Sequence, residues 1–274
     1  MSKKSSEYWA DRQAKQQAAI SRKAFKDIQK QLGKYYAASM KKVIEDFEAT
    51  YDKLVATAIA GRQPTPADLY KIDKYWKMQA QLSKELQKLG NKEIALLSKA
   101  FEKQWEDIYY SIKLPSDVAF STISTAGAEA MINVAWLPDG KNFSQRLWVN
   151  MQRLADTLNE NLINCVVTGK KTTELKKLLQ ERFDVSYHSA NTLVRTELAH
   201  IQVEAASKRY QDYGLKYYKF LADTDDRTCK HNHSGEESCE ELDGKRFLYS
   251  EMQVGKNCPP MHPNCRCTII PVIE

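Results

Sequence analysis

One apolar stripe near the amino terminus constrains the fold of this chain most strongly. From Phe25 to Leu54, apolar residues recur at steps of three and four positions, which is the spacing of one face of an α-helix. The stripe comprises Phe25, Ile28, Leu32, Tyr35, Tyr36, Met40, Val43, Phe47, Tyr51 and Leu54. It predicts a helix of about 35 residues that ends near Gly61 and buries this face against other helices or a partner.

The same periodicity continues up to residue 113. The segment Thr65–Asp68 combines a threonine N-cap, a proline in the first turn and an acidic residue near the positive end of a helix. A second helix is predicted from there to Gly90, and a third from Lys92 to Ile112. Three amphipathic helices with short connections predict an antiparallel bundle or an extended arm over residues 1–113.

Residues 114–214 are predicted to form a central helical domain. The predicted helices are 126–136, Phe143–Val167 with Gly169 as its C-cap, Thr172 to about Phe183, and Ser189–Tyr213 followed by Gly214.

Beyond Gly214 the pattern changes to short aromatic and β-branched segments. Strands are predicted at Leu215–Leu221, Lys245–Tyr249 and Cys267–Ile273. The fold class is therefore mainly α, with a long N-terminal helical bundle or arm, a central helical domain and a small C-terminal β unit at 215–274. A β unit with so little apolar sequence needs either a cross-link, such as a bound metal, or packing against the helices to fold stably.

A dense cysteine and histidine cluster lies in that β unit. Residues 229–267 hold five of the six cysteines and three of the five histidines within 39 positions. Zinc is bound by four nitrogen or sulfur ligands in a tetrahedron. The predicted ligands are Cys229, Cys239, His262 and either Cys265 or Cys267. Cys258, His231 and His233 are further candidates, whereas Cys165 lies alone on an apolar helix face and is predicted to be core.

A structural, zinc-knuckle-like site is the favoured interpretation of this cluster. The alternatives are buried free thiols, disulfides formed in an oxidising medium, or a vestigial site. A catalytic zinc would need an open coordination position and a general base, for which Glu240 and Glu241 are the nearby candidates. The sequence contains no H-E-x-x-H motif, no Ser/His/Asp order and no glycine-rich phosphate loop. The chain is therefore predicted to be no enzyme and to have no small-molecule substrate.

The charge distribution suggests a second functional surface. Residues 1–42 carry 11 Lys and Arg against 3 Asp and Glu, a net charge of +8, whereas the whole chain carries +6. Candidate contacts to non-specific DNA or an acidic protein surface are Lys15, Arg22, Lys23, Lys26, Lys30, Lys34, Lys41 and Lys42. The alternative is a solvated helix face without a partner.

No stretch of about 18 apolar residues and no apolar signal core are present, so neither a membrane span nor export is predicted. The protein is expected to remain in the cytoplasm where it is made, and in that reducing compartment clustered cysteines bind metal more often than they pair.

Several motifs occur in the order found in one viral family. They are Tyr8-Trp9-x-x-Arg12, Asp139-Gly140 with Phe143-Ser144-x-Arg146-Leu147-Trp148, Val194-Arg195-Thr196-Glu197, Cys239-x-x-Leu242-Asp243-Gly244-Lys245, and Pro259-Pro260-x-His262-Pro263-x-Cys265-Arg266-Cys267. The chain thereby resembles the phage head morphogenesis proteins, the Mu F-like minor head (minor capsid) proteins of tailed bacteriophages. The resemblance extends over nearly the whole chain, but this chain separates Cys229 from Cys239 by nine residues where the family sets its first two cysteines close together.

The resemblance implies a structural virion component present in few copies, located in the head interior or at the portal vertex, and in the host cytoplasm during assembly. It implies the portal protein and other capsid or scaffold proteins as partners, and roles in head assembly and in DNA packaging or ejection. The long helices would then dock on the portal or scaffold, and the basic residues on DNA or an acidic capsid surface.

Two other functions compete with this hypothesis. A zinc-containing nucleic-acid-binding protein of the host cytoplasm would explain the basic segment and the Cys/His cluster. An enzyme is the other, because the resemblance implies that relatives carry toxin or transferase modules fused to such a domain. The chain ends at Glu274, directly after the cluster, so no such module is expected.

Overall fold

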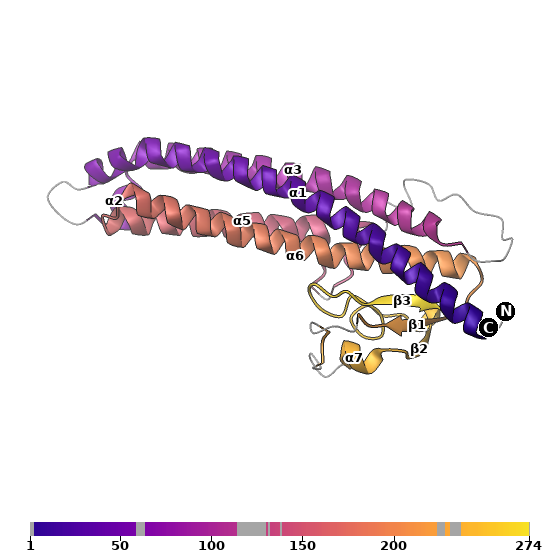
Figure 1. The fold of residues 1–274 in the computed structure, drawn as a ribbon. Coiled ribbons are helices and arrows are strands. Elements are labelled where there is room, and N and C mark those ends of the chain that lie inside the picture. The colour runs from indigo at the N-terminus through magenta and orange to yellow at the C-terminus, as the bar shows by residue number, and fades with distance from the viewer. Residues whose placement is uncertain are drawn as a thin grey trace. The chain divides into compact units, whose positions relative to one another are not determined.

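The computed structural model describes residues 3–58, 64–113, 130, 132–137, 139–223, 228–230 and 237–273. The long helices are α1 (Lys3–Ala58), α3 (Asp73–Ser111), α5 (Phe143–Val167) and α6 (Thr172–Asp212), as Figure 1 shows. The short elements are α2 (Pro66–Leu69), β1 (Tyr217–Leu221), α7 (Cys239–Leu242), β2 (Arg246–Leu248), the 3-10 helix η1 (Tyr249–Glu251) and β3 (Thr268–Pro271). The described part is thus mainly helical with a small C-terminal sheet, as predicted.

The chain divides into two compact units. Unit 1 comprises Met1–Ile28, Leu97–Phe143 and Thr192–Glu274, and unit 2 comprises Gln29–Leu96 and Ser144–Asn191. Both units are discontinuous in sequence, because α1, α3 and α6 each contribute to both. The division into segments 1–113, 114–214 and 215–274 remains a prediction about which parts fold on their own.

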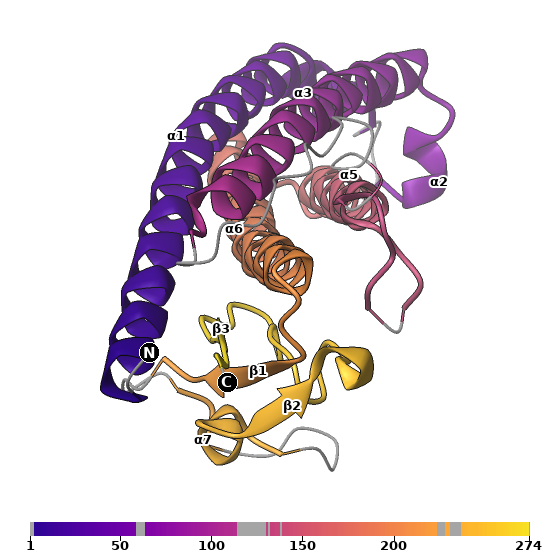
Figure 2. The same cartoon turned by 90° about the vertical axis from the view of Figure 1, so that its right-hand side faces the viewer.

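Unit 2 is a helical bundle built from parts of α1, α3, α5 and α6, which lie side by side in Figures 1 and 2. Its core is formed by buried side chains of all of them: Leu32, Val43, Phe47, Leu82, Leu86, Leu154, Leu158, Leu162, Leu179 and Phe183. Each such side chain stabilises the fold by roughly 1.5–3 kcal/mol relative to exposure. The stripe predicted on α1 therefore faces a core, and Cys165 is buried in the same bundle, as predicted.

Helix α3 corrects a predicted helix boundary. Gly90 was expected to end one helix before another began at Lys92, but α3 is continuous from Asp73 to Ser111. A Cβ at Gly90 would lie 2.8 Å from Cζ3 of Trp148, so this glycine admits the indole ring of α5.

Other predicted helix bounds also need correction. Helix α6 is a single helix, although two were predicted, because the segment 184–188 contains neither Gly nor Pro and its Ser186 and Tyr187 pack within the bundle. Helix α1 begins at Lys3 and is longer than predicted. The Thr65–Asp68 cap forms, since the Asp68 carboxylate accepts hydrogen bonds from the Thr65 amide and hydroxyl at 2.8 and 2.7 Å, but α2 spans only four residues.

The predictions for the C-terminal half are largely confirmed. Helix α5 has the predicted bounds, and both Gly169 and Gly214 have positive φ angles just beyond helix ends. The three predicted strands form an antiparallel sheet in the order β2-β1-β3 (Figure 2). Of the predicted helix at 126–136, residues 126–129 and 131 lie outside the described residues, and residues 133–136 are not helical.

Unit 1 packs this sheet on the second half of α6. Tyr218, Phe220 and Ile269 are fully buried in it. A buried hydrogen bond of 2.9 Å from Gln202 Nε2 to Thr268 Oγ1 joins α6 to β3, and Gln17 of α1 donates one of 2.9 Å to the Tyr210 hydroxyl. None of the described helices combines the length and hydropathy needed to cross a bilayer.

Candidate metal centre

Cys239 is positioned by the start of a short helix. It is the first residue of α7, and Ser238 before it is the N-cap. The Ser238 hydroxyl accepts a hydrogen bond from the Glu241 amide at 3.2 Å, and the Glu241 carboxylate accepts one from the Ser238 amide at 2.7 Å. These bonds lower the pKa of Glu241 and engage it as a cap. Because its carboxylate is engaged in the cap, Glu241 is a weak candidate for the general base of a catalytic zinc.

The nine residues between Cys229 and Cys239 do not keep the two segments apart. The Glu240 amide donates a hydrogen bond of 3.2 Å to the carbonyl of Cys229, so the chain returns to the start of α7. Cys229 also packs against the buried cluster that contains Cys239. The candidates His231 and His233 lie outside the described residues.

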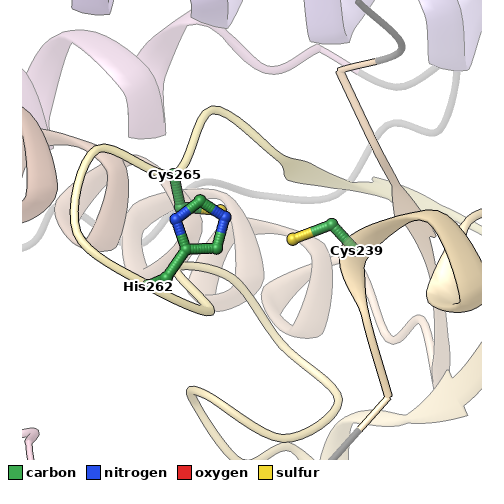
Figure 3. A group of neighbouring side chains, drawn as sticks. All are labelled: Cys239, His262 and Cys265. Carbon is green, nitrogen blue, oxygen red and sulfur yellow. The ribbon is translucent and has the colours of Figure 1, made fainter. Parts of the chain in front are cut away.

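A tight turn brings His262 and Cys265 together. The Cys265 amide donates a hydrogen bond of 3.1 Å to the His262 carbonyl. Between them Asn264 has a φ of 61°, a left-handed conformation that asparagine tolerates better than most residues. The turn therefore presents both side chains to the same side, as Figure 3 shows.

Three potential ligands converge at this point. One ligand atom each from Cys239, His262 and Cys265 lies within 4.8 Å of the others, and the Cys239 thiol points from α7 toward the turn (Figure 3). Ligand atoms around a tetrahedral zinc are about 3.8 Å apart for zinc–sulfur bonds of about 2.3 Å. Cys239 and Cys265 are each 1% exposed and His262 is half-buried, so the two thiols are shielded from water, which fits a structural cation site.

The orientation of the His262 ring suits metal binding. Its Nδ1 lies 2.9 Å from the Pro263 carbonyl, which accepts a hydrogen bond only if Nδ1 is protonated. Figure 3 shows the other ring nitrogen, Nε2, directed toward the sulfur of Cys265. A backbone carbonyl that fixes one nitrogen and frees the other is a common outer-shell contact of metal-binding histidines.

The charge of the cluster centres on Cys265. Hydrogen bonds from the thiols of Cys239 and Cys267, and one from His262, hold the pKa of Cys265 well below its usual value. The same contact with Cys265 raises the pKa of Cys239 and raises that of His262 to about 9. A thiolate surrounded by shared protons is a group that a cation can bind by displacing those protons.

The remaining cysteines take different positions. Cys267 is buried and its thiol interacts with those of Cys239 and Cys265, while Cys229 is half-buried at the edge of the cluster and interacts electrostatically with His262. Either could be the fourth ligand. Cys258 is fully buried outside the three-ligand group, where its thiol contacts the Pro259 carbonyl at 3.5 Å.

The predicted basic residues of α1 are all exposed. Three of them form ion pairs with acids four positions along the helix: Lys15 with Asp11 at 2.7 Å, Lys42 with Asp46 at 2.7 Å and Lys41 with Glu45 at 3.9 Å. Within the described part of the chain, Lys23, Lys26, Lys30 and Lys34 form no ion pair. These four lysines are therefore the stronger candidates for contact with an anionic partner.

Thr196 is a residue whose role the sequence left open. Its hydroxyl accepts a hydrogen bond of 3.0 Å from the amide of Asn264, in the turn between the two potential ligands. The signal available in the sequence was the spacing of Thr192 and Thr196, which puts two hydroxyl side chains on one helix face.

Comparison with known proteins gives a family and two relatives. Residues 156–270 match the family model described as "Phage Mu protein F like protein". A protein of Enterococcus faecalis named NAD(+)--arginine ADP-ribosyltransferase EFV is 25% identical over 191 residues, which cover 65% of this chain and 38% of that protein. An uncharacterized protein of Haemophilus influenzae is 24% identical over 119 residues, 43% of this chain and 25% of that protein.

The chain thus spans about two fifths and one quarter of the lengths of these relatives. No solved structure matches it significantly. The family match contains the Arg195-Thr196-Glu197 helix and the potential ligands Cys239, His262 and Cys265, but not the basic part of α1. Through residues 156–270 the chain is thus similar to the family of phage Mu F-like proteins.

Proposed function

We propose that this protein is a non-enzymatic minor head protein of a tailed phage, which associates with the portal vertex and takes part in head assembly. The observation that carries the proposal is the family match over residues 156–270. Similarity to a phage head family supports contact with other head proteins and a location in the virion. Association with the portal, and a role in DNA packaging or ejection, are more specific proposals than the family match alone supports.

We assign the docking function to the helices and a structural function to the metal centre. The long helices of unit 2 offer extended surfaces for another helical protein. The cluster of Cys239, His262 and Cys265, completed by Cys229 or Cys267, holds a zinc ion that staples the β unit. In this role zinc supplies no chemistry to a substrate. The chain covers 38% of the Enterococcus relative, so the activity in that relative's name is no part of the proposed function.

Co-expression with the portal protein tests the proposed association with the portal. A tagged portal should retain this protein on an affinity column through a wash of about 0.5 M salt, whereas the major capsid protein carrying the same tag should not. Retention by neither bait, or by both equally, would remove the portal from the proposal.

The rival function is a host-cytoplasmic zinc protein that binds nucleic acid. It is favoured by Lys23, Lys26, Lys30 and Lys34 of α1, which form no ion pair with the residues that the structure describes. Such a protein would bind DNA in a manner that is lost on zinc chelation. In the leading proposal any DNA contact lies on α1, far in sequence from the cluster, so salt-sensitive binding should survive chelation.

A further inference from the structure

The tripeptide Arg195-Thr196-Glu197 contacts three different parts of unit 1. Consecutive helix residues point about 100° apart, so neighbouring side chains reach different surroundings. The Arg195 guanidinium lies 4.4 Å from the centre of the Phe25 ring on α1. Glu197 is buried and accepts a hydrogen bond of 2.9 Å from the indole nitrogen of Trp136. The residue between them, Thr196, faces the metal-binding turn.

The contact of Thr196 with the turn is a partly buried hydrogen bond to the backbone. Thr196 is 8% exposed, donates its hydroxyl proton to the Thr192 carbonyl at 2.8 Å and accepts from the Asn264 amide at 3.0 Å. The Asn264 side chain also reaches the Thr192 hydroxyl at 3.5 Å. Asn264 lies between His262 and Cys265, so this bond fixes the backbone that carries both potential ligands.

A second bond fixes the other side of the same loop. Gln202 donates to the Thr268 hydroxyl, directly after Cys267, and its own side-chain oxygen accepts from Ser21 at 2.6 Å. Helix α6 therefore holds the loop at Asn264 and at Thr268, which bracket the two cysteines of the turn.

We propose that Thr196 is a positioning residue for the metal centre: its hydroxyl holds the turn so that His262 and Cys265 are arranged for a tetrahedral cation before the cation binds. The inference rests on the proposed zinc site. Outer-shell hydrogen bonds that orient metal ligands change metal affinity by roughly 10–100-fold when they are removed. Thr196 bonds to the backbone between the two potential ligands and not to a ligand side chain, so it lies one step further from the metal than a usual outer-shell residue.

The test is the zinc affinity of the full chain, measured by competition with a chromophoric chelator. Thr196→Val keeps the shape of the side chain and removes the acceptor, and should weaken zinc binding by about 10-fold or more. Thr196→Ser restores the hydroxyl and should return the affinity to within about threefold of the wild type. Thr157→Val is the matched control, because the Thr157 hydroxyl makes the same bond to the carbonyl four residues back, at 2.8 Å, on an exposed face.

Cobalt(II) in place of zinc adds a spectroscopic readout. The thiolate-to-cobalt absorption of Thr196→Val should shift or weaken at saturating metal, because the ligands no longer share one fixed geometry, while circular dichroism shows the wild-type helical content. If Thr196→Val does not fold, Thr196→Ala against Thr196→Ser gives the same comparison.

The outcomes distinguish the positioning role of Thr196 from the existence of the zinc site itself. Wild-type zinc affinity and cobalt spectra in folded Thr196→Val or Thr196→Ala would overturn the positioning role and leave the zinc site standing. A wild-type chain that binds no zinc would overturn both.

Discussion

The indole ring of Trp148 on α5 occupies the space that a side chain would fill at Gly90 on α3. A Cβ at Gly90 would lie 2.8 and 2.9 Å from two atoms of that ring and 3.3 Å from Cγ of Met151. This close approach explains why a helix of 39 residues keeps a glycine near its middle despite the cost in helix propensity.

The Gly90–Trp148 contact predicts a coupling energy of defined sign. In a Trp148→Ala background, Gly90→Ala should stabilise the protein by up to about 1 kcal/mol, the helix propensity difference. In the wild-type background the overpacking should cancel or reverse this gain, which gives a coupling of roughly 1–3 kcal/mol. Urea denaturation of the four proteins measures it, and additive effects would mean that the ring does not constrain position 90.

Glu93 predicts a pH dependence of stability. It is fully buried in unit 2 beside Tyr36. The Tyr36 hydroxyl lies 3.3 Å from the Ser186 hydroxyl, which also accepts a hydrogen bond from the Asn150 side chain. Burial raises the pKa of Glu93 from 4.5 to about 8. The folded state therefore binds a proton that the unfolded state releases above pH 4.5, so stability falls as pH rises from about 4.5 to 8 and then levels off.

Glu93→Gln should remove this dependence, because the amide stays neutral. The difference between wild type and variant should grow by on the order of 4 kcal/mol from pH 5 to pH 9, at about 1.4 kcal/mol per pKa unit. Denaturant midpoints at both pH values measure it, with Glu106→Gln on the exposed surface of the same helix as a control. Parallel pH profiles of wild type and Glu93→Gln would show that the carboxyl is not desolvated.

Helix types and ends could be predicted where the signal is local. The period and the Gly169 cap defined Phe143–Val167, and the change of period after Gly214 located the strands. The prediction failed at Gly90 because the same glycine that ends many helices can also admit a neighbouring ring. It also divided α6 into two helices, although the five residues between them contain no helix breaker.

The candidate site could be predicted only where its signal is local in sequence. Ligand chemistry and spacing were enough to nominate Cys239, His262 and Cys265, which the structure brings together. The bond between Thr196 and Asn264 joins residues 68 positions apart and depends on tertiary packing, so no local pattern reveals it. The return of the chain from Cys229 to Glu240 is likewise a tertiary hydrogen bond.

The metal centre predicts a defined pattern of zinc content. Purified wild type should hold about one zinc per chain, and Cys239→Ser or Cys265→Ser should hold almost none, because a closed site needs all four ligands. One of Cys229→Ser and Cys267→Ser should lose zinc and the other should keep it. Cys258→Ser is the control and should retain zinc, since Cys258 lies outside the group. Equal zinc content in wild type and Cys239→Ser, by elemental analysis, would refute the site.

The exposed lysines of α1 predict how DNA binding responds to salt. Replacing Lys23, Lys26, Lys30 and Lys34 by Gln should reduce the slope of log affinity against log salt by up to about 3.6, at roughly 0.9 per phosphate contact. The control replaces Lys15, Lys41 and Lys42, which already pair with acids, and should change the slope less. Fluorescence anisotropy with duplex DNA measures both, and equal slopes in wild type and the four-lysine variant would exclude this face.

The composition of purified particles tests the central claim most directly. Proheads and mature virions of a phage that encodes this protein should be separated on a gradient, and their proteins quantified by mass spectrometry against the portal and the major capsid protein. The protein should co-sediment with both kinds of particle in a small, fixed ratio to the portal, in far fewer copies than the major capsid protein. Its absence from proheads and from virions would contradict the assignment as a minor head protein.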